Sequence, residues 1–244
     1  DDLVAEDAIL MLSSDGSVGK STISINAAAA MSAGTPVWGQ FRCVRPLRVY
    51  YVISERTATE ALRRLRRMQG ICPANPENIW ISDCFAGTCN LLLDGDADSL
   101  IQRIQEDAPD GIDILVLDPL YPLVAGALSE DRVGNILCRQ LVRIKRTLRW
   151  VLWLCHHNVK LRLTDDGKLG RPPNAMFGSV WLYNLLTLQL AAIKETATQT
   201  VLHNQKDNWS CAPKSVTLVY QADTETVATP DDMGPMRKGE RVNV

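Results

Sequence analysis

The sequence has 244 residues, of which 46% are hydrophobic and 22% are charged, a composition typical of a globular protein with one large core. The formal net charge of −2 excludes a global basic field, so any contact with nucleic acid needs a local patch or several subunits. No apolar run approaches the roughly 20 residues that span a bilayer, and seven cysteines without Cys-x-x-Cys spacing argue against a zinc site. With no signal peptide evident, we expect a protein of the reducing cytoplasm that makes no membrane contact.

Apolar strands alternate with helices along the first two thirds of the chain. Continuous apolar runs that stop at polar residues are typical of buried parallel strands, and a 3.6-residue apolar period indicates helices between them. The expected elements are, in chain order, strand 8–12, helix 21–31, strand 48–53, a basic helix with Leu62, Leu65 and Met68 on one side, strand 79–81, a helix marked by Leu100, Ile101 and Ile104, strand 112–117, helix 131–149 and strand 151–155.

The last third of the chain changes character, from alternating elements to successive strands. Residues 185–193, 198–203 and 215–221 predict an antiparallel extension of the same sheet. The end of the chain is rich in Pro, Gly and charge, which is typical of a loosely held tail. We therefore expect an α/β fold with a mainly parallel twisted sheet and helices on both faces, in one domain over residues 1–228 with a tail at 229–244.

A loop of small residues joins the first predicted strand to the first helix. It reads Ser14-Asp15-Gly16-Ser17-Val18-Gly19-Lys20-Ser21-Thr22. Loop amides and a helix N-terminus attract phosphate, the lysine reaches the terminal phosphates, and the serine after it ligates Mg²⁺. Glycines keep side chains out of the phosphate path. The sequence thus predicts a phosphate-binding loop over all nine residues, against the alternative of a serine-rich loop before an unrelated helix.

Ser14 stands where the strict P-loop (Walker A) pattern has its first glycine. That position needs a small residue at a tight turn, and serine is small. We therefore interpret the loop as a working nucleotide site.

Further polar residues follow predicted strands at the sheet edge where ligands bind in open α/β sheets. Asp118 closes the apolar run 112–117 and suits the magnesium shell. Glu55 follows strand 48–53 and is a candidate to orient the attacking water, or else a solvated glutamate that opens the next helix. His156 and His157 follow strand 151–155, where one could hydrogen-bond a terminal phosphate, or both could simply cap the strand.

Together these segments resemble the RecA-like ATPases of the plasmid-replication RepA type, the hexameric replicative helicases and their phage relatives. The resemblance covers roughly residues 8–221 and rests on SSDGSVGKS, YVISER, ILVLDPL, LCHHNVK, FGS and QKDNW, in this order. It implies ATP and Mg²⁺ as cofactors, and serine is tolerated at the first loop position in that family. It also implies phosphate and metal roles for Lys20 and Ser21, a second metal carboxylate at Asp118, a catalytic glutamate at Glu55 and a phosphate sensor at His157.

The sequence departs from the family where the neighbouring subunit's arginine finger is expected. Residues 178–187 contain no arginine, although such a finger can be worth on the order of 10³–10⁵ in turnover. Lys206, in Lys206-Asp207-Asn208-Trp209, matches a Lys-x-Asn turn of the family and is the candidate replacement. The alternatives are an ordinary hairpin lysine and a slow ATPase.

A glycine-containing loop supplies the candidate nucleic-acid contacts. Lys160, Arg162, Lys168 and Arg171 could touch phosphates without sequence preference and with strong salt dependence. The loop lacks the aromatic residues of single-strand binders, so an uncommitted surface loop is an equal alternative.

Two other groups of side chains have simpler interpretations. The arginines at 63, 64, 66 and 67 are typical of a solvated helix face more than of a DNA patch. Trp150, Trp153 and Trp181 adjoin apolar runs and are expected in the core or at subunit contacts.

We therefore expect an ATP hydrolase that forms a homo-oligomeric, hexameric ring and moves on single-stranded DNA, as a replicative-type helicase does. The alternative is a nucleotide-gated oligomer that binds DNA or regulates, with slow turnover and no unwinding. A P-loop kinase for small molecules would need a lid of arginines, which the sequence does not show convincingly.

Overall fold

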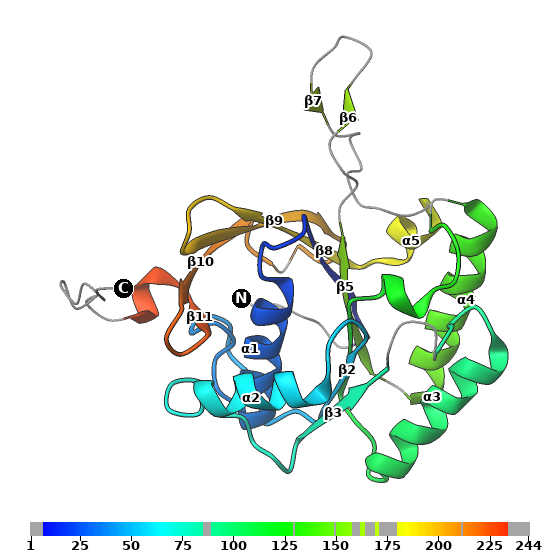
Figure 1. Cartoon of the computed structure of the whole chain (residues 1–244), viewed down its shortest axis with the longest axis horizontal. Helices are drawn as coiled ribbons and strands as arrows, with labels where there is room; N and C mark the ends of the chain where they lie inside the picture. Colours follow the sequence, from blue (N-terminus) through cyan, green and yellow to red (C-terminus); the bar gives the residue numbers. More distant parts are fainter. Residues whose placement is uncertain are drawn as a thin grey trace.

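A single mixed sheet organises the chain (Figure 1). The structure, a computed structural model, describes residues 7–84, 89–128, 130–148, 150–157, 180–210 and 212–233, and the backbone of 162–163 and 169–170. Within these ranges the sheet has nine strands in the order β11-β10-β9-β8-β1-β5-β4-β2-β3. The predicted fold class, a mainly parallel sheet with helices on both faces and antiparallel C-terminal strands, is confirmed.

Six neighbouring strands run parallel, and their carboxyl ends therefore meet at one edge. In spatial order they are β8 Leu188–Lys194, β1 Ile9–Ser14, β5 Val151–His157, β4 Ile114–Asp118, β2 Val49–Ile53 and β3 Ile79–Asp83. β1, β2 and β4 are buried along their whole length, because helices cover both faces of a parallel sheet.

The remaining strands extend this sheet in the antiparallel sense. They are β9 Gln199–Asp207, β10 Ser215–Gln221 and β11 Thr226–Ala228. A separate two-stranded ladder joins β6 Arg162–Leu163 to β7 Leu169–Gly170.

The predicted start of the 185–193 strand is wrong. Leu185 ends a helix, α5 Val180–Leu185, and the strand begins three residues later. Thr187 lies in the connection between them, and its hydroxyl accepts a hydrogen bond from the Ile9 amide at 2.9 Å, which ties this connection to β1. A short apolar run does not by itself distinguish a buried helix from a buried strand.

Helices cover the two faces of the sheet and enclose two cores (Figure 1). One face carries α1 Lys20–Ala33 and α2 Ala58–Met68, and the other carries α3 Asp94–Asp107, α4 Asp131–Leu148 and α5. Side chains of each strand alternate between the cores, so Tyr51 faces α1 whereas Tyr50 faces α3. No described helix combines the length and the hydropathy that a bilayer crossing requires.

The buried stripe of α2 differs from the predicted one at a single position. Leu65 and Met68 are buried as expected, but Leu62 is 43% exposed and Ala61 takes its place in the core. Each helical residue turns by about 100°, so the spacing of Ala61, Leu65 and Met68 keeps these three on one side. Leu62 is rotated away from them into solvent.

This difference predicts unequal effects for two leucines of α2. Leu65→Ala should lower the free energy of unfolding by about 2–4 kcal/mol, because it removes buried methyl groups and leaves a cavity. Leu62→Ala, the matched control, should change it by less than about 0.5 kcal/mol. Denaturant titration of both variants measures the difference, and equal losses would contradict the placement of α2.

The C-terminal boundary between domain and tail stays a prediction. A 3₁₀ helix, η2 Pro230–Met233, follows β11, and the Thr229 amide donates to the Trp38 carbonyl at 3.0 Å. These residues therefore contact the body of the protein, although residues 229–244 are predicted as tail. Residues 234–244 lie outside the described part of the chain.

Candidate functional site

The loop between β1 and α1 forms an open cradle of backbone amides. Ser17 and Gly19 have φ angles of 63° and 98°, in the left-handed region that glycine favours. Within the described residues, the amides of Gly16, Ser17, Val18 and Gly19 have no hydrogen-bond acceptor. A Cβ added at Gly16 or Gly19 would meet no atom within 4 Å. Space and unpaired donors at a helix N-terminus are what an anion requires.

Lys20 folds back over this loop. Its side chain is buried, and its Nζ donates to the Ser14 Oγ at 3.0 Å, the Ser14 carbonyl at 3.4 Å and the Asp15 carbonyl at 3.3 Å. Burial lowers the pKa of this ammonium, while nearby acidic groups, Cys155 and Asp118 among them, partly offset the effect. Ser14 thus supplies a side-chain acceptor that glycine could not offer.

Asp118 lies at the end of β4, beside the start of α1. It is 3% exposed, and its register partner in β2 is Ile53. Burial raises the pKa of Asp118, and the nearby hydroxyls of Tyr51 and Ser21 oppose this rise. In the described part of the chain its Oδ1 has no hydrogen-bond partner.

Glu55 and His157 form the outer side of the site. The His157 Nδ1 lies 3.2 Å from the Lys20 Nζ, and its Nε2 lies 3.8 Å from the Glu55 Oε1. Burial and then the Lys20 ammonium lower the pKa of His157, which favours the neutral imidazole, whose Nδ1 can accept a hydrogen bond from the ammonium. The ring of Tyr121 contacts that of His157 edge to face, with centroids 5.5 Å apart. His156 is fully buried, so only the second histidine reaches the loop.

Arg64 of α2 joins the site from the other side. Its Nη1 donates to the Thr22 Oγ1 at 3.1 Å and its Nη2 to the Glu60 Oε1 at 3.3 Å. Arg63, Arg64 and Arg67 all lie within 4 Å of the Glu225 carboxylate in the turn before β11. The solvated-face interpretation is therefore wrong for Arg64, whose side chain is 16% exposed.

These residues fit a nucleoside triphosphate with Mg²⁺. The cradle offers unpaired amides and a lysine ammonium for phosphate oxygens. Ser21 and Asp118 line one small pocket together with Glu55 and Arg64, and the free carboxylate oxygen of Asp118 is the kind of ligand that Mg²⁺ prefers.

The structure brings most of the predicted site residues together. The loop from Ser14 to Thr22 meets Asp118, Glu55 and His157 at one edge of the sheet, because all four strands end there. Sequence reasoning did not identify Tyr51, Tyr121 or Arg64 as site residues. The sequence signal for Tyr51 is a hydroxyl group within an apolar strand, since a buried hydroxyl needs a polar partner.

Lys206 lies away from this edge. It pairs with Gln189 in the ladder, towards the start of β8, and its Nζ donates to the Tyr183 carbonyl at 2.8 Å and the Asn184 carbonyl at 3.4 Å. Its ammonium also lies 4.8 Å from the centroid of the Tyr183 ring. In its own chain it therefore caps α5, and a role in a neighbouring subunit stays a prediction.

The predicted nucleic-acid contacts fall mostly outside the described residues. Lys160, Lys168 and Arg171 lie there, as do Gly178 and Ser179 of the FGS segment. Arg162 is described by its backbone alone, as part of β6, where it pairs with Gly170. Their role stays a prediction.

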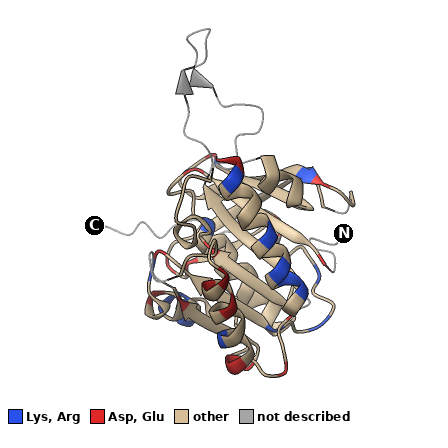
Figure 2. Cartoon of the chain, turned by 90° about the vertical axis from the view of Figure 1, so that its right-hand side faces the viewer, with Lys and Arg blue, Asp and Glu red and all other residues tan. Residues whose placement is uncertain are grey.

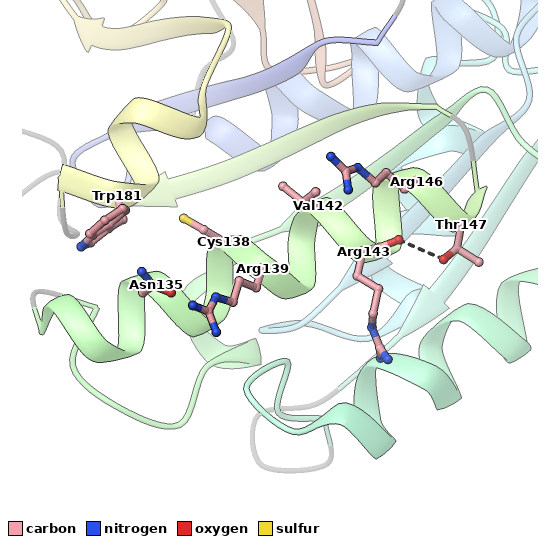
Figure 3. Close-up of a pocket in the computed structure, with 8 residues that line it drawn as sticks. All are labelled: Asn135, Cys138, Arg139, Val142, Arg143, Arg146, Thr147 and Trp181. Atoms are coloured by element: carbon pink, nitrogen blue, oxygen red, sulfur yellow. Dashed lines mark hydrogen bonds between the residues drawn. The ribbon is translucent and has the colours of Figure 1, made fainter.

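A second hollow, of about 550 Å³, lies between α4 and α5 (Figure 3). The α4 helix is basic, whereas the neighbouring α3 is acidic (Figure 2). Arg143 donates to the Asp98 carboxylate at 2.8 Å. Trp181, on α5, is 47% exposed at this hollow, whereas Trp150 and Trp153 are buried in the cores. The hollow is lined by Asn135, Cys138, Arg139, Val142, Arg143, Arg146, Thr147 and Trp181.

Comparisons with known proteins agree with this fold. A search of solved structures finds a DnaB-like replicative helicase, from a study of its interactions with primase, with a TM-score of 0.64 at 14% identity. The match covers 91% of this chain and 58% of the helicase chain, so this chain spans little more than half of that protein. No curated protein matches the sequence. A family profile described as AAA domain matches residues 1–162. The chain therefore belongs to this AAA domain family.

Proposed function

We propose that this protein is a magnesium-dependent ATP hydrolase whose site lies at the carboxyl edge of β1, β5, β4 and β2. The observation that carries the proposal is a buried Lys20 over an open amide cradle, next to a buried Asp118 oxygen without a partner. Lys20 and the amides of the loop bind the phosphates, and Ser21 and Asp118 hold the metal. Bound Mg²⁺ would neutralise charge that develops on the phosphate oxygens.

Glu55 is the catalytic carboxylate in this proposal. It is partly exposed beside His157 and points into the pocket that Ser21 and Asp118 line, so it is positioned to orient a water and take its proton. His157 lies next to both Lys20 and Glu55. It therefore senses the lysine, which moves from the loop carbonyls to phosphate when nucleotide binds.

We further propose that the protein works as a homo-oligomeric ring, a hexamer, on single-stranded DNA in the cytoplasm. The fold that it shares with a DnaB-like replicative helicase supports a helicase-type motor. In this proposal Trp181 contributes to a contact with a second copy, since it is a large apolar side chain left exposed. Lys206 would serve the neighbouring site, and Lys160, Arg162, Lys168 and Arg171 would contact the strand.

One observation favours a second function, a nucleotide-gated oligomer with slow turnover. Residues 178–187 contain no arginine, and Lys206, the candidate replacement, is engaged by carbonyls of its own chain. Such a protein would assemble on ATP and hydrolyse it rarely.

Steady-state ATPase rates with and without single-stranded DNA at low salt, combined with particle mass in nucleotide, separate the two functions. A motor should hydrolyse Mg-ATP faster on single strands and give a ring-sized particle. A gated binding module should oligomerise with ATP, with negligible turnover under both conditions. No nucleotide binding at all would exclude both.

A further inference from the structure

Two adjacent tyrosines of β2 place their hydroxyls on carboxylates on opposite faces of the sheet. Tyr50 and Tyr51 are 0% and 1% exposed. The Tyr50 hydroxyl donates to the Asp107 Oδ2 at 2.5 Å, and the Tyr51 hydroxyl donates to the Asp118 Oδ2 at 2.5 Å. Successive residues of a strand point to opposite faces, so only the second tyrosine faces the nucleotide loop.

The hydrogen bond from Tyr51 makes the two carboxylate oxygens of Asp118 inequivalent. Oδ2 accepts a hydrogen bond from the phenol, while Oδ1, also buried, has no hydrogen-bond partner in the described part of the chain. A tyrosine phenol is protonated at neutral pH, so it is the donor in this hydrogen bond. The carboxylate is therefore held at one oxygen and open at the other.

Because Asp118 is buried, its carboxylate depends on nearby hydrogen-bond donors. Moving a carboxylate out of water is costly unless donors replace the lost hydration. The Tyr51 hydroxyl, the Ser21 hydroxyl and the Cys155 thiol are hydrogen-bonding groups beside it, and the Lys20 ammonium is the nearby positive charge. The Cys155 thiol also forms a hydrogen bond with the Ser24 hydroxyl, whose oxygen lies 2.9 Å from the Cys155 sulfur. Among the described residues, the Tyr51 hydroxyl makes a direct hydrogen bond to this carboxylate, at 2.5 Å.

From this geometry we infer that Tyr51 is a positioning residue for the magnesium carboxylate: its hydroxyl holds Asp118 by Oδ2 so that Oδ1 alone faces the metal. The inference rests on the proposed function, in which Asp118 holds Mg²⁺. Hydrogen bonds to a metal-ligating side chain orient it in many proteins, and their loss weakens metal binding by about 10- to 100-fold. In this inference Tyr51 acts through Asp118 and is not itself a ligand of the metal.

The test compares nucleotide affinity with and without the metal. Calorimetry measures the dissociation constant of adenylyl imidodiphosphate in EDTA and in Mg²⁺. The value in EDTA divided by the value in Mg²⁺ reports how much the metal strengthens binding. Tyr51→Phe should lower that ratio about tenfold relative to wild type, and leave the affinity in EDTA unchanged. Because the EDTA value reports an intact loop, a folding defect is recognised separately.

Tyr50→Phe is the matched control, because it removes one buried phenol from the same strand and one short hydrogen bond to a carboxylate. Its ratio should stay within about twofold of wild type. In turnover assays, Tyr51→Phe should raise the Mg²⁺ concentration at half-maximal rate about tenfold, while the rate at saturating Mg²⁺ changes much less. A merely structural role would instead lower the rate at saturating Mg²⁺ and leave the Mg²⁺ concentration at half-maximal rate unchanged.

A double-mutant cycle gives a second readout. If Tyr51 acts through Asp118, then adding Tyr51→Phe to Asp118→Asn should not lower the ratio further. A wild-type ratio in Tyr51→Phe overturns the inference and leaves the proposed function standing. A ratio of one in the wild-type protein overturns the metal site itself, and with it the role of Tyr51.

Discussion

Lys20→Ala should abolish nucleotide-dependent activity almost completely. The ammonium is a buried cation that lies over the loop and makes three hydrogen bonds to loop oxygens, at 3.0–3.4 Å. Removal of a preorganised charge of this kind costs on the order of 10²–10³ in turnover. We also expect the affinity for Mg-ATP to fall by about tenfold or more, measured by calorimetry alongside steady-state ATPase rates.

Lys145→Ala is the control for this prediction. Lys145 is a partly buried lysine of α4 whose ammonium pairs with the exposed Asp7 at 2.6 Å, and α4 covers the face of the sheet opposite α1. It should leave the affinity and the turnover near wild type. If Lys20→Ala retained both, the loop would not be the nucleotide site.

Glu55→Gln should separate binding from chemistry. The amide keeps the shape of the side chain but does not accept a proton, and general bases of this kind contribute roughly 10²–10⁴ in rate. The affinity for Mg-ATP should stay within a few-fold, because Glu55 lies beside the cradle and not in it. Single-turnover hydrolysis and calorimetry on the same variant measure both quantities.

Glu77→Gln serves as the matched charge change, since Glu77 is exposed and precedes β3 at the opposite edge of the sheet. It should hydrolyse ATP at the wild-type rate. Wild-type turnover in Glu55→Gln would assign the base elsewhere and leave the binding site intact. Loss of binding in that variant would instead show that Glu55 has a structural role.

Ser14 illustrates how a departure from a pattern can have a physical explanation. The strict pattern places glycine there, yet the hydroxyl of Ser14 accepts a hydrogen bond from Lys20 and donates to the Asp15 carbonyl at 2.7 Å. The serine therefore holds the lysine over the loop before any phosphate is present. Its small size keeps the turn, and its oxygen adds a contact.

The elements whose structure depends on nearby residues were predictable from the sequence. The loop is one of them, because Gly19 adopts a left-handed φ and Lys20 begins the helix directly after it. The continuous apolar strands are another, since burial on both faces needs no information from distant residues. The same local logic identified Asp118 and Glu55 as residues at strand ends.

Contacts that depend on strand order and on helix placement required the tertiary structure. Tyr51 meets Asp118 because β2 lies next to β4, although the two residues are 67 positions apart. Arg64 meets Glu225 because the turn before β11 lies over α2, and Leu62 is exposed because the core selects a different side of that helix.

The sequence by itself determined the glycine-containing loop between the first strand and the first helix, the alternation of buried strands and helices, and the residues that end the strands. Only the tertiary structure decided which of those ends are neighbours, which oxygen of Asp118 is free and which arginine reaches Thr22. The physical reason is range: backbone conformation and apolar periodicity are set by adjacent residues, whereas a hydrogen bond across the sheet is set by strand order and register.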